Sequence, residues 1–352
     1  MTPGPGGTDG QGNRVNVDEG SPAMVTRRTV LGAAAGLGIG IGLGGARPGT
    51  AAAAPAGFPD YRYLGVAFDK NALAYNPTGE LIFPCIRGTA GRVANALGRY
   101  YLYYAPHDAP GGICLSYGDH LNERFTEYRG NPIVTRSWAP HYNVSHVSSP
   151  HVMWNDDVNE MWLYFHGENT TTRLARSKNG IDFTYDKVVL STSMLYAGAT
   201  EASYARVFRH DLPAVGGRYV MVFMINDTTN RRSIGWGWSG DGRNWTFSQT
   251  PLIRPQDVGV QNISGPHIVK RNGSTYVVYH CNKEAGGTLL ITEVGNDFTR
   301  RDHLGVFHRP LAGAPDNGRC AAPSFGTEGG VEYMFYEAGE RLSGAIAVAR
   351  AV

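Results

Sequence analysis

The sequence predicts an all-β fold, a five-bladed β-propeller built from four-stranded antiparallel blades. Five segments repeat one pattern of short strands and turns, and no segment of the mature chain has a helical period of useful length. The 47 glycines and 11% aromatic residues suit short strands and tight turns. Each repeat is too small to bury both of its faces, so the repeats must stack, and a closed ring leaves few exposed edges. An open β-sandwich with coincidental spacing is the alternative.

The repeat has the same order of strands in every segment. The first strand follows a proline or a small residue, the second is rich in Tyr, Phe and Val, and the third follows a polar loop. The first strands are expected at residues 83–86, 149–153, 202–207, 265–269 and 322–325. The second strands are expected at 99–104, 161–165, 218–223, 275–279 and 332–336. The third strands are expected at 112–116, 172–175, 233–236, 288–291 and 344–348.

Four of the five segments close with a turn of Asp, Asn or Gly and an aromatic–Thr pair. The clearest of these turns covers residues 239–245, and it resembles the Asp-box turn of sialidase-like propellers. Asp241 and Gly242 suit the side-chain-to-backbone bonds and the left-handed backbone of such a turn. Trp245 is expected to pack between blades.

Residues 1–56 are expected to lie outside the propeller, which is predicted to be a catalytic domain at 57–352. Arg27 and Arg28 precede an apolar run at 30–43 that is rich in Gly and Ala, and small residues at 51–56 offer cleavage sites. This segment resembles a twin-arginine signal peptide and predicts a secreted, periplasmic or cell-envelope protein. A membrane anchor is the alternative, but the run is too short and too rich in glycine to span a bilayer securely.

Charge and cysteine content bear on the partners and cofactors. The net charge is only +2 and the basic residues are scattered, which argues against nucleic acid as a partner. The four cysteines, Cys85, Cys114, Cys281 and Cys320, form no close CxxC pair. A zinc knuckle is therefore not expected. Histidine could supply a metal site, but no two histidines have the close spacing of a helix-borne zinc motif, so we expect no metal and no cofactor. Buried thiols are the simplest interpretation, and Cys281 and Cys320 are the pair to test for a disulfide.

The repeat also predicts where a functional site lies. Successive strands of a blade are antiparallel, so each inner strand begins at the end of the ring where the loop between strands two and three lies. These positions surround one mouth of the central channel. The inner-strand starts are Cys85, His151, Glu201 with Tyr204, His267 and Ser324. Seven of the eleven histidines map to this end: His107, His141, His146, His151, His166, His267 and His280.

The five-unit pattern resembles the propeller glycosidases of the arabinanase/xylosidase and invertase/levanase types. The resemblance implies an Asp base or nucleophile in blade one, an Asp modulator in blade two and a Glu acid in blade three. In this chain the first two positions read Phe83-Pro84-Cys85 and Ser149-Pro150-His151, without a carboxylate. Only Glu201, in blade three, matches. The resemblance therefore implies a glycosidase-like enzyme with divergent catalytic positions.

Glycoside hydrolysis needs one group to protonate the leaving oxygen and another to activate water or attack carbon. Glu201 is the expected acid, and its neighbours in a partly dry channel would raise its pKa. Asp108 and Glu168 are candidates for the second carboxylate, because both lie on loops at the same mouth. The alternatives are a turn-capping role for Asp108 and a surface charge for Glu168.

A polysaccharide lyase is the competing hypothesis. Cleavage of a uronate-containing glycan by β-elimination needs a His or Tyr base, a group for the leaving oxygen, and an Arg or Asn that neutralises the carboxylate. The sequence offers His146, His151, Tyr142, Tyr204 and Arg206 for these roles. Arg206 is two residues after Tyr204, so both would point to one side of a regular strand. An inter-blade salt bridge is the alternative role for Arg206.

A glycan-binding propeller without catalysis is the third hypothesis, with Trp138, Tyr142 and Trp236 as stacking faces. In each case the expected partner is an oligosaccharide or polysaccharide. The candidate substrate-binding residues are His107, Trp138, His141, Tyr142, His146, His166, Arg206, Asp227, His267 and His280.

Overall fold

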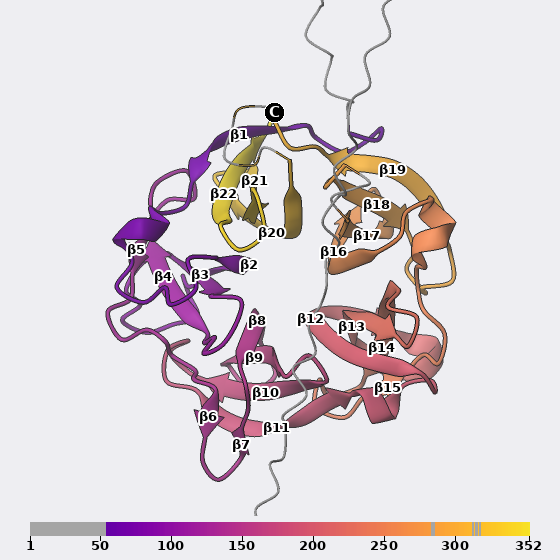
Figure 1. Ribbon diagram of the computed structural model, residues 1–352, viewed down its shortest axis with the longest axis horizontal. Helices are drawn as coiled ribbons and strands as arrows, with labels where there is room; N and C mark the ends of the chain where they lie inside the picture. Colours follow the sequence, from indigo (N-terminus) through magenta and orange to yellow (C-terminus); the bar gives the residue numbers. More distant parts are fainter. Residues whose placement is uncertain (1–53, 283–285, 312, 314–315, 317) are drawn as a thin grey trace, which may run out of the picture. The chain divides into compact units, whose positions relative to one another are not determined.

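A computed structural model describes residues 54–282, 286–311, 313, 316 and 318–352. Five four-stranded antiparallel sheets lie radially around a central axis, which confirms the predicted five-bladed β-propeller (Figure 1). The predicted signal peptide lies outside the described residues, apart from residues 54–56. Within the described ranges, no helix is long and apolar enough to cross a membrane.

The first four blades each use four strands in chain order, from the channel outward. Blade one contains β2 (Ile82–Gly88), β3 (Tyr100–Ala105), β4 (Cys114–Gly118) and β5 (Thr126–Glu127). Blade two contains β8 (Val147–Asn155), β9 (Glu160–Gly167), β10 (Thr171–Ser177) and β11 (Thr184–Ser191). Blade three contains β12 (Ala199–Leu212), β13 (Gly217–Asp227), β14 (Arg232–Ser239) and β15 (Thr246–Phe247). Blade four contains β16 (Ile263–Arg271), β17 (Ser274–Cys281), β18 (Leu289–Glu293) and β19 (Asp302–His308).

The last blade joins the two ends of the propeller. It contains β20 (Cys320–Glu328), β21 (Val331–Ala338), β22 (Ala345–Ala351) and, outermost, β1 (Tyr61–Val66). Because β1 pairs antiparallel with β22, the ring is closed by hydrogen bonds between the start and the end of the fold (Figure 1). The remaining elements are the hairpin β6 (Ser137–Trp138) and β7 (Tyr142–Asn143) and the short helices η1 (Lys70–Ala72), η2 (Thr192–Met194), η3 (Pro213–Val215) and η4 (Pro255–Val258).

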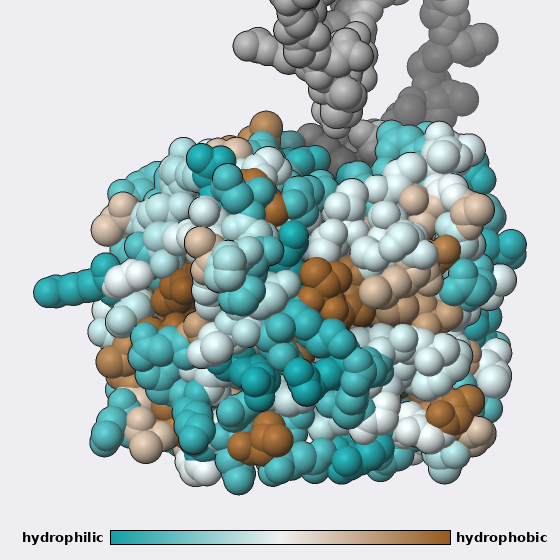
Figure 2. Space-filling view, turned by 90° about the horizontal axis from the view of Figure 1, so that it is seen from below, coloured by the Kyte–Doolittle hydropathy of each residue, from teal (hydrophilic) through white to brown (hydrophobic). Residues whose placement is uncertain are grey.

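The hydrophobic core lies between the blades. In β13, Tyr219, Met221 and Phe223 pack with blade two, whereas Val220 and Val222 pack with blade four. Both faces of such a strand are buried, which explains why the second strand of each repeat is an almost continuous apolar run. The side of the ring in Figure 2 is mainly hydrophilic, with hydrophobic residues in separate small patches. The four cysteines are buried, and Cys281 and Cys320 are not joined by a disulfide.

The closing turns connect neighbouring blades. In the turn at 239–245, Asp241 Oδ1 accepts hydrogen bonds from the backbone N–H groups of Arg243 and Asn244, each at 2.8 Å. The Tyr164 hydroxyl of blade two donates to the Gly242 carbonyl at 2.8 Å. Trp245 packs edge-on against Tyr164, as expected for a residue between blades.

The same contact recurs one blade earlier. The Tyr103 hydroxyl of blade one donates to the carbonyl of Gly180, in the closing turn of blade two, at 2.8 Å. Each of these two turns is therefore a docking point for a tyrosine of the preceding blade.

Candidate functional site

One end of the channel has the geometry that the repeat predicts. The start of each inner strand pairs with the end of the second strand, as in the pairs Ser148–His166 and Ala321–Glu337. The loops that follow the second strands therefore lie at the end where the inner strands begin. We call this end the mouth.

Every inner strand contains a two-residue bulge at the same position. The ladder between inner and second strand skips two residues in all five blades. The first skipped residue has a left-handed backbone, with φ between 43° and 59°, in Phe83, Ser149, Tyr204, Gly265 and Ala322. A proline follows in four of the blades, which a bulge tolerates because the ladder needs no N–H there. Bulges redirect side chains, and here they do so around the channel.

Two of the bulge residues form the floor of the mouth. The rings of Phe83 and Tyr204, from blades one and three, stack with centroids 4.3 Å apart and an angle of 23°. Ile82, Ala105, Met224 and Ala322 complete this buried cluster. The floor is therefore an aromatic pair at the centre of the ring.

Polar residues occupy the position three residues before each bulge. These residues are Glu80, His146, Glu201, Asn262 and Arg319, one from each blade. Glu80 and Glu201 therefore occupy equivalent positions of blades one and three, the two blades that supply the floor.

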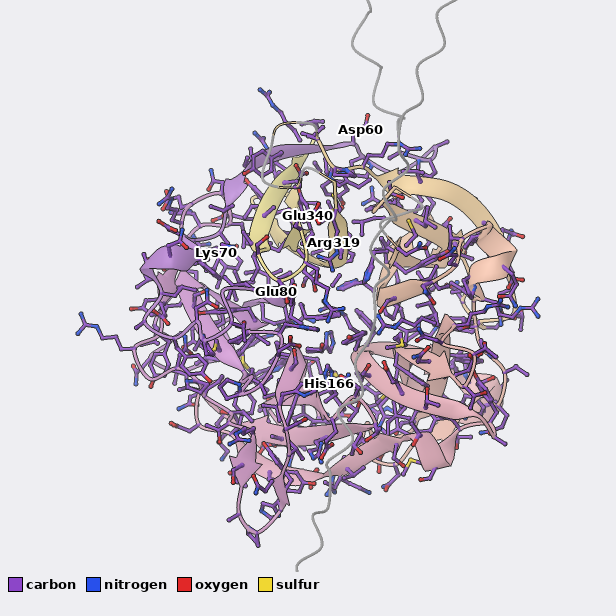
Figure 3. All side chains as sticks on the ribbon, viewed as in Figure 1. Asp60, Lys70, Glu80, His166, Arg319 and Glu340 are labelled. Atoms are coloured by element: carbon purple, nitrogen blue, oxygen red, sulfur yellow. The ribbon has the colours of Figure 1, made fainter. Side chains whose placement is uncertain are left out.

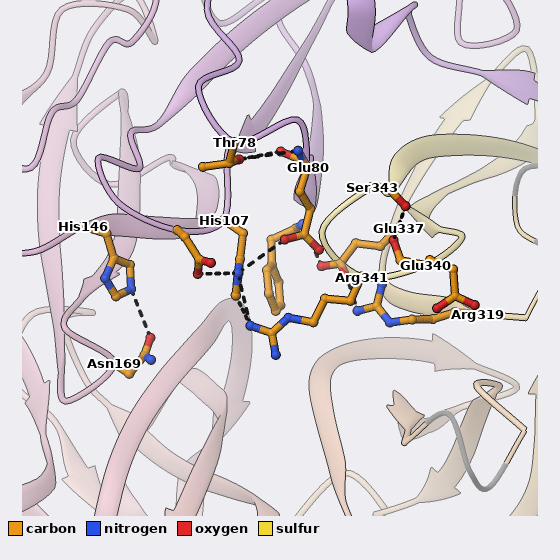
Figure 4. A network of polar contacts seen from close by, with 12 residues as sticks. Thr78, Glu80, His107, His146, Asn169, Arg319, Glu337, Glu340, Arg341 and Ser343 are labelled. Atoms are coloured by element: carbon orange, nitrogen blue, oxygen red, sulfur yellow. Dashed lines mark hydrogen bonds and ion pairs between the residues drawn. The ribbon is translucent and has the colours of Figure 1, made fainter. Parts of the chain in front are cut away.

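Glu80 is the most deeply buried carboxyl group in this set, with 1% of its side chain exposed. Burial raises its pKa, a backbone hydrogen bond from Leu342 opposes the rise, and the nearby Glu337 adds to it. Oε2 of Glu80 lies 3.4 Å from Nδ1 of His107 (Figure 4). Glu80 is thus suited to keep a proton at a higher pH than an ordinary glutamic acid.

His107 links Glu80 to two exposed charged groups. Its Nδ1 lies 2.7 Å from Oδ1 of Asp108, and Arg341 Nη2 lies 3.2 Å from both ring nitrogens. Burial and the Arg341 charge lower the pKa of His107 to about 4, so its imidazole is neutral at neutral pH. Asp108 has 62% of its side chain exposed and faces solvent.

Glu337 is anchored by two donors. Arg319 Nη2 donates to Oε2 at 2.6 Å, and the backbone N–H of Phe83 donates to Oε1 at 3.0 Å (Figure 4). The pair joins the start of the inner strand of blade five to the end of its second strand. Because Glu337 also binds the backbone of Phe83, it fixes the floor.

Glu201 is less buried than Glu80. Its Oε1 accepts a hydrogen bond from Asn226 Nδ2 at 3.4 Å, and its Oε2 lies 3.9 Å from Arg232 Nη2. Its carboxyl group has 21% exposure. Both partners are on blade three, so this carboxyl group is oriented within its own blade.

A second group at the mouth contains aromatic and histidine side chains. The His166 ring lies edge-on to the rings of Tyr204 and His146, with centroids at 5.2 and 5.7 Å. Burial lowers the pKa of His166 well below its ordinary value. Burial raises the pKa of Tyr204, whose hydroxyl lies within the fields of Arg232, Glu201, Arg341 and Glu337. His146 Nε2 lies 3.3 Å from Asn169 Oδ1 (Figure 4).

His280 belongs to the mouth on the blade-four side. The backbone N–H of Ala322 donates to its Nδ1 at 3.3 Å. Burial lowers its pKa well below the ordinary value, and Arg319 and Arg232 contribute. A view of all side chains shows the labelled Glu80, His166 and Arg319 on different blades around the channel (Figure 3).

Other predicted residues lie deeper in the channel. Directly after each two-residue bulge, the inner strands present Cys85, His151, Arg206, His267 and Ser324, all buried. His151 Nε2 lies 2.7 Å from the Val207 carbonyl, and Arg206 Nη2 donates to the Pro84 carbonyl at 3.0 Å. His267 Nδ1 lies 2.9 Å from the Ile268 carbonyl. The bulge at 204–205 interrupts the regular strand alternation that would have placed Arg206 beside Tyr204.

The structure places a third group of predicted residues around blade two. Trp138, His141 and Tyr142, from the β6–β7 hairpin, contact Tyr185 of the outermost strand β11. Glu168 follows β9, has 38% exposure and lies 3.5 Å from Arg173. The three hairpin residues contact the outer edge of blade two, whereas Glu168, in the loop that follows β9, lies at the mouth end of the ring.

Asp227 stabilises its own loop in blade three. Its Oδ1 accepts hydrogen bonds from the backbone N–H groups of Thr229 and Arg231 at 2.8 and 3.2 Å. It also lines a separate hollow of about 280 Å³ with Tyr196 and Arg254.

Sequence reasoning missed Glu80, Arg319 and Arg341 as site residues. A usable signal existed for two of them. Counting three residues back from the bulge, as for Glu201, would have found Glu80 and Arg319. Glu337 and Arg341 lie in or beside a loop that was assigned to the mouth, but nothing in their spacing revealed their partners.

No protein-family model matches this chain, and no curated protein is significantly similar to it in sequence. Solved structures do match. A structure described as a BT0996 RGII complex has 14% identity and a TM-score of 0.64, with 84% of this protein and 92% of that one covered. The two proteins share a fold. A structure described as a glycoside hydrolase gives 14% identity and a TM-score of 0.63, with the same coverage. The catalytic domain of a GH62 α-L-arabinofuranosidase from Coprinopsis cinerea gives 9% identity and a TM-score of 0.60, covering 85% and 98%.

Proposed function

We propose that this protein is a glycoside hydrolase that cleaves an oligosaccharide or polysaccharide at the mouth. The proposal rests mainly on the pair Glu80 and Glu201. These two carboxyl groups occupy equivalent positions of blades one and three but lie in different environments. Pairs of titratable groups in contrasting environments are typical of acid and base assignments. The fold shared with structures described as glycoside hydrolases supports the same class.

Glu80 is proposed as the proton donor, since burial raises its pKa and favours the protonated form. Its carboxyl group accepts a backbone hydrogen bond from Leu342, in the exposed segment 340–343 between β21 and β22, so we expect a substrate to displace side chains of this segment to reach it. Sequence analysis assigned the acid role to Glu201. We propose Glu201 as the second carboxyl group, because it is partly exposed and oriented by Asn226.

The floor has a corresponding role in this proposal. Sugar rings present C–H faces that pack on aromatic rings, and we propose the Phe83–Tyr204 pair, from the two blades that carry the carboxyl groups, as such a surface. Arg341 and His107 would then contact hydroxyl groups at the rim. The arrangement suits a neutral sugar whose ring lies above the floor.

A lyase is the second candidate, and the contact between His166 and Tyr204 favours it. His166 is neutral near pH 7, so it can act as a base, and the Tyr204 hydroxyl lies near Arg232 and Arg341, which could pair with a uronate carboxylate. This chemistry leaves an unsaturated uronate, whereas hydrolysis does not.

Incubation of the full chain with plant and microbial glycans separates these functions. Reducing sugar released without an absorbance rise in the unsaturated-uronate band is the expected result. A rise in that absorbance would instead assign the lyase. Binding without any product would leave a glycan-binding propeller and contradict the hydrolase proposal.

We also propose that the chain is exported by the twin-arginine route, as Arg27 and Arg28 suggest. Replacing both by lysine in the full chain should leave the protein in the cytoplasmic fraction. Unchanged export of this variant would contradict the proposed route.

A further inference from the structure

The connection between blades four and five brings together three side chains of metal-ligating type. His308 ends β19, Cys320 begins β20, and Asp316 lies between them in the chain. One potential ligand atom from each residue lies within 4.8 Å of the others, and all three residues are buried. This cluster belongs to the junction of the blades and is separate from the residues assigned to the proposed hydrolysis.

His308 has an unused ligand atom. Its Nε2 is buried without a hydrogen-bond partner among the described residues, and only 8% of the residue is exposed. Tyr336 and Tyr61 lie edge-on to the ring and fix its plane. An unpaired buried ring nitrogen is costly unless something binds it.

Asp316 is a fully buried carboxyl group whose hydrogen-bond donors, among the described residues, are all uncharged. It accepts hydrogen bonds from the Tyr336 hydroxyl at 2.7 Å and from the Leu311 backbone N–H at 3.3 Å. The Cys320 thiol points to its Oδ2 at 3.9 Å. No basic side chain in the described part of the chain forms an ion pair with Asp316. A bound cation would supply the missing positive charge.

We propose that His308, Asp316 and Cys320 bind a zinc ion. Imidazole nitrogen, thiolate sulfur and carboxylate oxygen are the ligand types that Zn²⁺ accepts, usually in tetrahedral geometry. Three protein ligands leave one tetrahedral position for water. The Tyr336 hydroxyl would orient the carboxylate from outside the ligand shell.

Charge balance supports zinc at this position. Zn²⁺ with one thiolate, one carboxylate and one neutral imidazole has no net charge, which suits a buried site. On binding, the Cys320 S–H bond breaks, sulfur keeps the electron pair to bond the metal, and the proton leaves to solvent. Zinc needs ligand bonds of about 2.0–2.3 Å, so small side-chain movements would close the present spacing.

The proposed ion would stabilise the junction and, through it, the mouth. It would join the last strand of blade four to the first strand of blade five. Arg319, the residue before Cys320, donates to Glu337 at the mouth. The metal would therefore help to position Arg319 without contacting the substrate.

Metal analysis of the purified full chain, after dialysis against Zn²⁺ and then metal-free buffer, tests this site. We expect one equivalent of zinc per chain, with most of it lost in Cys320→Ser and in His308→Gln. Cys114→Ser is the matched control, because Cys114 is also a buried free thiol but lies in another cluster. Its zinc content should equal that of the wild type.

Co²⁺ provides a readout that does not depend on activity. The wild type should show a thiolate-to-cobalt charge-transfer band, and Cys320→Ser should lose it while the circular dichroism of the β-fold is retained. If Cys320→Ser fails to fold, His308→Gln with the same readouts replaces it. No stoichiometric zinc in the wild type, or equal zinc in wild type and both variants, would overturn the proposal.

Discussion

Glu80 and Glu201 occupy the same position in blades one and three, each three residues before the left-handed residue of its inner strand. That residue is aromatic in both blades, and the rings of Phe83 and Tyr204 stack at 4.3 Å. Glu201 lies in β12 and Glu80 lies two residues before β2, so both carboxyl groups are at the start of the strands that form the floor of the mouth. The proposed hydrolysis depends on this relationship.

The pH dependence of hydrolysis should report the protonation of Glu80. Because burial raises its pKa, kcat should fall as the pH rises through a value above the ordinary glutamate pKa of 4.5. Glu337, Arg341 and Arg319 contribute to that pKa, and His107, neutral above about pH 4, cannot supply this limb. Measurement of kcat against pH checks the assignment, and a profile with no falling limb on the alkaline side would contradict it.

Burial of Glu80 should also lower the free energy of unfolding of the protein at neutral pH. Its folded-state pKa lies above its unfolded value, so its contribution is most favourable below the ordinary pKa and falls as the pH rises through the folded-state pKa. The free energy of unfolding of Glu80→Gln, minus that of the wild type, should therefore increase as the pH rises from acid to neutral. Urea unfolding at several pH values measures this slope. A difference that is constant with pH would contradict the burial argument.

Gly265→Ala should destabilise the fold at the mouth. Its φ is 55°, and a β-carbon there would lie 2.7 Å from Nδ1 of His280. We expect a loss of about 1–3 kcal/mol in unfolding free energy from strain and contact. Ala322→Gly is the matched control, because Ala322 has the same bulge position with φ 43°. Glycine relieves backbone strain at position 322. Equal losses of unfolding free energy in the two variants would therefore contradict the claim that Gly265 and Ala322 occupy the same bulge position.

Tyr164→Phe should weaken the docking of blade two on blade three. It removes a buried hydrogen bond of 2.8 Å to the Gly242 carbonyl, which still accepts from Trp245. The expected loss is about 1 kcal/mol. Tyr117→Phe serves as control, since the Tyr117 hydroxyl has no hydrogen-bond partner among the described residues. If chemical denaturation gave both variants the wild-type stability, the contact between Tyr164 and the turn would not stabilise the docking of the two blades.

The blade order was predictable because each second strand is buried on both faces and reads as an apolar run, as in residues 218–223. The position of β1 was not, because its pairing with β22 spans almost the whole fold. The chain pattern around Tyr61 gives no sign of its distant partner.

The site was predictable only in part. Antiparallel pairing correctly brought the strand starts and loops to one end, where His107, His146, His166, Glu201, Tyr204 and His280 lie. The sequence gives no sign of the bulges at Ser149 and Tyr204, so it predicts His151 and Arg206 at the mouth although they lie deeper in the channel. The contact of the Phe83 backbone with Glu337 joins residues 254 positions apart, and no local spacing encodes it.

The most direct test of the central claim is release of reducing sugar by Glu80→Gln and Glu201→Gln on a glycan that the wild type cleaves. Each substitution removes a proposed acid–base group, so each should lower kcat by about 10²–10⁴-fold with the fold retained. Glu123→Gln, an exposed change in blade one, should retain wild-type activity. Wild-type activity in both Glu80→Gln and Glu201→Gln would contradict the account.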